Sequence, residues 1–327
     1  MTRIPRFVFS IEFSVGVLVL LAMMVIGAIN PSFWQLQNIF GLLRSNVVIG
    51  IMALGVLAAL ICGGIDVSFT AFAALGAYAA LRLGYIYAST SALLPLVIGV
   101  AIGGGLGCIN ALLIDKIKII PLIATLGTGS IVRGLLLGAI GAKIVNVDKM
   151  PQGLMDAGSV QLFTVTGPDG SKVGLPAVFL AYVAIAVLMH LFLTRTMVGR
   201  SLFAVGGDPE AASRVGFDVG HARLIAYGLS GALAGLAGVT HAALNWVGEP
   251  RAFDNMTLDV LAAVILGGAS IFGGRGSVIG TMIGVFMLVL ISNSLIILGI
   301  PTTWQRVLLG VVIIVVTGAI YVRRAQV

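Results

Sequence analysis

The chain has 327 residues, of which 59% are hydrophobic and 9% are charged. A soluble domain carries roughly 25% charged residues, so most of the surface of this chain must face lipid rather than water. The mean hydropathy of +1.13 agrees with this. The net charge of +7 lies in short segments between apolar runs, without a basic stripe interleaved with aromatic residues, which argues against a nucleic-acid partner.

The apolar runs predict an all-α polytopic membrane protein with about ten transmembrane helices, some of them broken. The first run is long and has no small-residue cleavage site, so we expect a retained span. The eighth is shorter than the ~20 residues that cross a bilayer, which indicates an earlier start or a broken helix. In chain order, the runs are 11–30, 46–62, 67–86, 92–114, 120–141, 175–195, 222–243, 258–272, 277–298 and 303–321.

The distribution of Lys and Arg predicts the orientation, because these residues favour the cytoplasmic side. With alternating spans, both termini are expected in the cytoplasm, the segment 142–174 outside and the loop 196–221 inside. Residues 159–173 alternate partly around a Gly-Pro-Asp-Gly turn, which predicts a small β-hairpin. We expect residues 1–327 to form a single transmembrane domain.

Two Gly-Gly pairs end similar apolar stretches. Residues 57–64 and 261–268 are identical at six of eight positions. Such an echo indicates either an internal repeat, as in many transporters, or coincidence in an Ala/Leu/Gly-rich sequence, and the sequence leaves both open. In either case helix breaks are expected at Gly63, Gly64, Gly267 and Gly268.

A short helix is predicted at 209–215 in the cytoplasmic loop. Asp208 is a good N-cap, Glu210 complements the helix dipole, and Glu210 and Arg214 are four residues apart in the favourable order. Gly216 can end the helix in a left-handed conformation. A helix this short needs packing, either against a partner protein or against its own membrane domain.

The same helix carries a family motif. Glu210-Ala211-Ala212, followed after three residues by Gly216, resembles the EAA-xxx-G core of the cytoplasmic loop in bacterial ATP-binding-cassette (ABC) importer permeases. The family pattern continues as I-x-L-P, which residues 226–229 do not match. The resemblance implies a coupling helix that docks into an ATPase subunit, with Ala211 and Ala212 facing it. The implied coupling residues are Asp208, Glu210, Ala211, Ala212, Arg214 and Gly216.

A closer resemblance covers nearly the whole chain. The motifs Gly-Gly-Ile-Asp-Val-Ser at 63–68, Thr-Leu-Gly-Thr with Arg-Gly at 125–134, and Val-Ile-Leu-Gly-Gly with Gly-Gly-Arg-Gly at 264–276 resemble those of the ribose/galactose/xylose-type branched permease family. The resemblance implies one permease domain in a bacterial plasma membrane. It implies a pentose, hexose or polyol substrate, a solute-binding protein, a second permease copy or homologue, and ATPase subunits that bind ATP and Mg.

Several polar residues lie in or beside the spans and are candidates for the path of a neutral solute. The alternative is that they join helices by hydrogen bonds, which is the commoner use of Asn, Ser and Thr in membranes. Arg133 is well inside a span, where an internal pair or snorkelling is expected. The candidates are Asn46, Asp66, Ser68, Asn110, Thr125, Thr128 and Asn293.

The competing hypothesis is an ion-coupled secondary carrier. Such a carrier is expected to bury acidic residues, and Asp66 is the one weak candidate. The sequence has no phosphate-binding loop of the G-x-x-x-x-G-K-[ST] type, so no nucleotide cofactor is expected in this chain. No nucleophile–base pair or metal-ligand spacing is present, so neither catalysis nor a metal site is expected.

Overall fold

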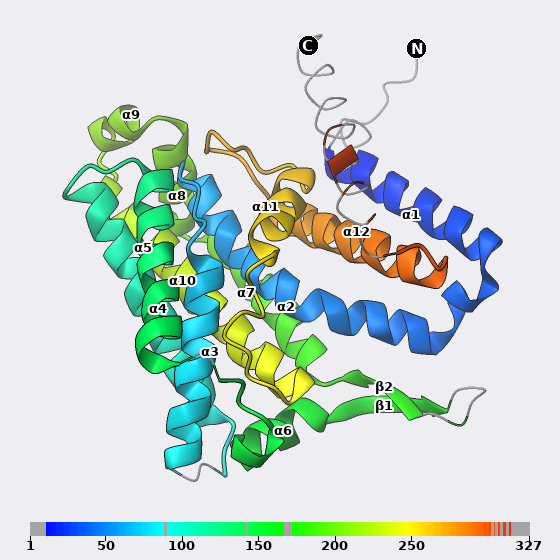
Figure 1. Ribbon diagram of the computed structural model, residues 1–327. Coiled ribbons are helices and arrows are strands. Elements are labelled where there is room, and N and C mark those ends of the chain that lie inside the picture. The colour runs from blue at the N-terminus through cyan, green and yellow to red at the C-terminus, as the bar shows by residue number, and fades with distance from the viewer. Residues whose placement is uncertain are drawn as a thin grey trace, which may run out of the picture.

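The structure is a computed structural model that describes residues 11–87, 90–141, 143–166, 170 and 172–301, and positions 304, 307, 310, 311 and 314. Eight of the described helices are long and apolar enough to cross a membrane. The fold class is therefore the predicted one, an all-α polytopic membrane protein (Figure 1). These helices are α1 (Ile11–Ile29), α2 (Leu36–Ile61), α3 (Phe69–Ile86), α4 (Leu93–Asp115), α5 (Pro121–Leu135), α7 (Val178–Arg195), α10 (Val219–Asn245) and α12 (Val278–Ile297).

The two remaining predicted spans have different outcomes. The segment 258–272 contains α11 (Met256–Leu266), a helix too short to cross a bilayer, so the broken-helix alternative is confirmed. The last predicted span, 303–321, lies largely outside the described residues. A π-helical turn, η3 (Leu136–Ile140), extends α5.

The second span begins earlier than predicted, at Leu36 rather than 46, after the 3₁₀ turn η2 (Pro31–Trp34). The polar residues in the first turns of α2 lower its hydropathy, so the apolar pattern did not predict that the helix begins at Leu36. One of them, Arg44, donates a hydrogen bond to the carbonyl oxygen of Leu244 in α10. A hydropathy pattern treats such a charge as the end of a span, although α2 continues through it.

Helix α10 lies at the centre of the protein and packs most extensively against α4. Glycines on both helices make this contact close: a Cβ on Gly231 would overlap the carbonyl oxygen of Gly103, and one on Gly235 would overlap that of Gly99. Small residues at four-residue spacing let membrane helices approach in this way. The abundance of Gly, 44 residues, is thus used partly for helix packing.

The two long loops hold more structure than the sequence predicted. The segment between α5 and α7 contains η4 (Val147–Lys149), α6 (Gln152–Ser159) and an antiparallel hairpin of β1 (Gln161–Thr166) and β2 (Lys172–Pro176). The hairpin is confirmed, whereas α6 was not predicted. The loop 196–221 contains α8 (Met197–Gly207), also not predicted, and α9 (Pro209–Arg214). In Figure 1, α9 and the hairpin lie at opposite ends of the molecule.

Candidate functional site

Helix α9 forms as its capping residues predict. The Asp208 carboxylate accepts hydrogen bonds from the backbone N–H groups of Glu210 (2.9 Å) and Ala211 (3.0 Å). Gly216 has a φ of 93°, and the N–H of Phe217 donates to the carbonyl oxygen of Ala212 at 3.0 Å. The helix ends one residue before the predicted position 215, because Val215 is already outside helical geometry.

The exposed face of α9 differs in one residue from the expected one. Ala212 is 3% exposed and packs on its own chain, so the expectation that both alanines face a partner is wrong for Ala212. The exposed residues of α9 are Pro209, Glu210, Ala211, Ser213 and Arg214, and Val215, which follows the helix, is exposed as well. The Arg214–Glu210 ion pair, at 3.5 Å, lies on the surface and contributes little to stability.

A glycine junction ties the base of α9 to the interior. A Cβ on Gly206, near the end of α8, would overlap the carbonyl oxygen of Ile61, the last residue of α2. The N–H of Gly274 donates to that same oxygen at 2.9 Å. Gly63 and Gly273 complete the junction: a Cβ on Gly273 would lie 2.6 Å from the Cα of Gly63. Three chain segments therefore meet backbone to backbone here.

Each Gly-Gly pair directly follows the end of a helix or its C-cap residue. Helix α2 ends at Ile61 and α11 ends at Leu266. Gly63 and Gly268 have φ values of 87° and 93°, which favour glycine. Gly64 and Gly267 lie outside that region and are required for space instead, since a Cβ on Gly267 would overlap the carbonyl oxygen of Gly280.

Asp66 is fully buried between α2 and α3, and both of its carboxylate oxygens accept hydrogen bonds. Oδ1 accepts from the N–H (2.9 Å) and the hydroxyl (2.6 Å) of Ser68. Oδ2 accepts from the hydroxyl of Ser230 in α10 at 2.7 Å. A buried carboxylate that is satisfied in this way fixes the turn after α2 against α10.

The network continues into α4 and α5. The Nδ2 of Asn110 donates to the Ser68 hydroxyl at 2.8 Å, and the Thr128 hydroxyl donates to the Asn110 Oδ1 at 2.7 Å. The Thr125 hydroxyl donates to the carbonyl oxygen of Ile65 at 3.2 Å. Five predicted pathway residues thus form one polar network, and Thr128, half-buried, is the one nearest the surface.

The other two pathway candidates do not join this network. Asn46, on α2, donates to the Leu42 carbonyl oxygen of its own helix at 2.8 Å. The Oδ1 of Asn293, on α12, is buried and has no hydrogen-bond partner among the described residues. Arg133 forms the expected internal pair, with its Nε 3.3 Å from Asp254 Oδ1.

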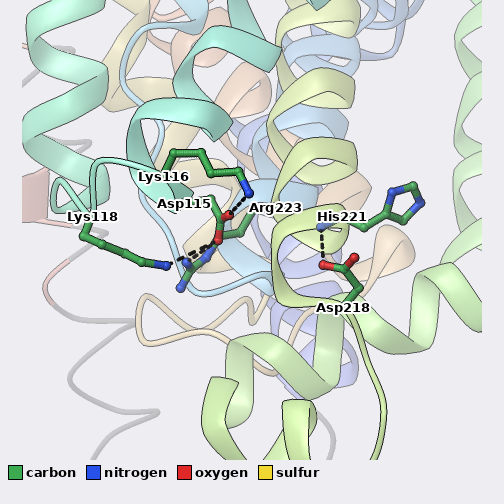
Figure 2. A network of polar contacts seen from close by, with 6 residues as sticks. All are labelled: Asp115, Lys116, Lys118, Asp218, His221 and Arg223. Carbon is green, nitrogen blue, oxygen red and sulfur yellow. Dashed lines mark hydrogen bonds and ion pairs between the residues drawn. The ribbon is translucent and has the colours of Figure 1, made fainter.

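One ionic cluster was not singled out from the sequence. Asp115, at the end of α4, pairs with Arg223 of α10 at 3.2 Å and with Lys116 and Lys118 at 3.8 Å each, as Figure 2 shows. A cavity of about 270 Å³ beside it includes His221 in its lining. The sequence Asp-Lys-x-Lys at 115–118 could have indicated the local ion pairs. The contact with Arg223 could not be predicted in this way, because it spans 108 positions of sequence.

Among the described residues, no three His, Cys, Asp or Glu side chains are grouped so that they could hold a metal ion. Helices α8 and α9, the glycine junction and the Asp66 network instead connect an exposed surface helix to the membrane interior.

Comparison with known proteins agrees with this geometry. Residues 38–317 match the family model described as branched-chain amino acid transport system / permease component. The chain is 36% identical over 291 residues to a ribose import permease of Bacillus subtilis, covering 89% of this chain and 87% of that protein. It is 32% identical over 295 residues to a D-allose transport system permease of Escherichia coli, covering 89% and 85%.

A ribose import permease of Escherichia coli is 31% identical over 301 residues, which cover 92% of this chain and 90% of that protein. No solved structure matches the chain significantly. The family match spans more than four fifths of the sequence and includes every element of the site described above. The chain therefore belongs to the permease family of ABC importers that includes these sugar permeases.

Proposed function

We propose that this chain is the membrane-spanning subunit of an importer that moves a sugar or sugar-like solute inward, driven by ATP hydrolysis in a separate subunit. The observation that carries the proposal is the similarity to ribose and D-allose permeases over about nine tenths of the chain. The exposed helix α9, capped at both ends, supports the ATPase as partner because its free face has nothing to pack on within the described protomer.

The proposed orientation places α9 in the cytoplasm and the β1–β2 hairpin outside. The separation of these two elements to opposite ends of the molecule supports it (Figure 1). A solute-binding protein would then deliver its cargo to the side of α6 and the hairpin. Both termini are proposed to be cytoplasmic, as the Lys and Arg bias favours.

The proposed solute path passes the Thr128 end of the Asp66 network. Hydroxyl and amide groups suit a neutral polyhydroxy solute, and Thr128 is the half-buried member of the network. The buried members, Asp66 and Ser68, would then hold the helices that shape the path. A second permease copy would complete it on the exposed side of α5.

The test is reconstitution in proteoliposomes with the ATP-binding subunit and the solute-binding protein encoded with this chain. We expect ATP-dependent uptake of a pentose, hexose or polyol, and no ATP hydrolysis by this chain alone. Uptake by this chain alone, driven by a proton or sodium gradient, would establish the secondary-carrier alternative instead. Calorimetric titration of the binding protein with candidate sugars would identify its ligand, and that ligand is the expected transported solute.

A further inference from the structure

The loop between α11 and α12 carries an aromatic side chain on the surface. Phe272 is 91% exposed, and its neighbour Ile271 is 42% exposed. The surrounding residues are polar or glycine: Ser270, Gly273, Gly274 and Arg275. An aromatic side chain exposed to this extent is available for contact with a partner, and aromatic residues are enriched among those that dominate interfaces.

The loop that presents Phe272 is held in one shape by its own backbone. The N–H of Ser270 donates to the carbonyl oxygen of Arg275 at 3.0 Å, and the N–H of Gly273 donates to that of Ser270 at 3.2 Å. Gly273 and Gly274 have positive φ values of 90° and 70°. A preorganised side chain loses little conformational freedom when it binds, so this loop is suited to recognition.

The loop is continuous with the base of α9. A Cβ on Gly274 would lie 3.0 Å from the Cα of Gly207, which is two residues before Pro209. Phe272 and Pro209 line the same cavity of about 210 Å³. Figure 1 shows the loop between α11 and α12 reaching toward α8 and α9. A partner that binds α9 would therefore also meet Phe272.

We propose that Phe272, with Ile271, is a second docking contact for the ATPase subunit, beside the recess that Phe272 and Pro209 help to line. This inference rests on the proposed function and extends it, because α9 was the only contact that the family motif implied. Aromatic side chains at the centre of an interface commonly carry much of its binding energy. The glycine junction beneath both elements would let one docking event act on α2, α8 and the α11–α12 loop together.

The experiment measures the affinity of the ATP-binding subunit encoded with this chain for the purified full-length permease in detergent. Phe272→Ala is expected to weaken binding by about tenfold or more, and Phe272→Leu by less, because leucine keeps an apolar group. Folding should be unaffected, since the side chain is almost wholly exposed. Tyr87→Ala is the matched control: it removes a 70% exposed aromatic side chain at the far end of α3 and should leave the affinity unchanged.

Val215→Lys changes the exposed residue that directly follows α9, and it tests docking at α9 separately from docking at Phe272. If wild-type protein does not bind the ATPase, the proposed function fails. If Val215→Lys weakens binding while Phe272→Ala does not, the coupling helix stands and the second contact is overturned. An effect of Phe272→Ala on uptake in bilayers without any effect on affinity in detergent would assign Phe272 to lipid and overturn it as well.

Discussion

The turns after α2 and α11 follow nearly the same amino-acid sequence. The first leads to a buried segment and the second to an exposed one. In the first, the N–H of Gly64 donates to the carbonyl oxygen of Ala59 at 3.1 Å, around the left-handed Gly63. In the second, the N–H of Ala269 donates to that of Val264 at 3.2 Å, around Gly268. This is the same glycine-terminated helix end.

The similarity continues for two more residues and then stops. Asp66 and Ser270 are aligned in the sequence comparison of the two stretches, and each accepts a hydrogen bond from the N–H two residues on, at 2.9 and 3.2 Å. Asp66 is buried and also binds Ser230, whereas Ser270 leads to the exposed Phe272. The local sequence thus determines the turn. Contacts with distant residues, such as that of Asp66 with Ser230, determine whether the next segment is buried or exposed.

The comparison also bears on the internal echo. The sequences align Gly64 with Gly268, but the residue with positive φ is Gly63 in one turn and Gly268 in the other. The left-handed glycine is therefore displaced by one position. A strict repeat keeps such a residue in register, so a shared way of ending a helix accounts for the echo.

The largest effect is expected where the two turns meet. Gly206→Ala should lower uptake on the order of 100-fold, because its methyl group would overlap the Ile61 carbonyl oxygen and a misfit of this kind costs about 3 kcal/mol. Gly207→Ala is the neighbouring control, since a Cβ there meets nothing within 4 Å. Uptake in proteoliposomes is measured for variants that elute as monodisperse complexes with the ATPase. Equal activity of the two variants would show that the turns are not joined through Gly206.

An intermediate effect is expected on the free energy of unfolding, which should differ between the buried turn at Asp66 and the exposed turn at Ser270. Asp66→Ala should lower the free energy of unfolding by about 3 kcal/mol, because it leaves the buried hydroxyls of Ser68 and Ser230 without their acceptor. Ser270→Ala, at the matching position, should lower it by about 1 kcal/mol or less, because only one exposed backbone donor loses a partner. Thermal unfolding in detergent, followed by fluorescence, checks both. Similar losses would mean that burial does not distinguish the turns.

The smallest effect tests why each glycine is needed. Gly64→Ala should destabilise by about 2 kcal/mol, because the new methyl group overlaps the Tyr227 hydroxyl. Among the residues that the structure describes, that buried hydroxyl has no hydrogen-bond partner, so Tyr227→Phe alone should be neutral or stabilising and should rescue Gly64→Ala. Gly268→Ala strains a positive φ, at about 1–2 kcal/mol, and should not be rescued. A double-mutant cycle on unfolding midpoints decides this, and rescue of both variants would contradict it.

The sequence by itself determined what depends on neighbouring residues. Low charge and long apolar runs predict the membrane class, because few charged groups are available to meet water. The caps at Asp208 and Gly216 predict α9 almost to the residue, because capping bonds reach only two to four positions along the chain. The Gly-Gly pairs predict both helix breaks for the same reason.

Only the tertiary structure decided which surfaces those elements show. Ala212 is as small and helix-favouring as Ala211, yet the packing of α9 on its own chain buries one and exposes the other. Asp66, Asn110 and Thr128 come from separate elements and form one network only when the helices pack. Arg44, in α2, donates a hydrogen bond to a carbonyl oxygen 200 positions away in the sequence. Such contacts depend on long-range packing, which no local pattern of residues encodes.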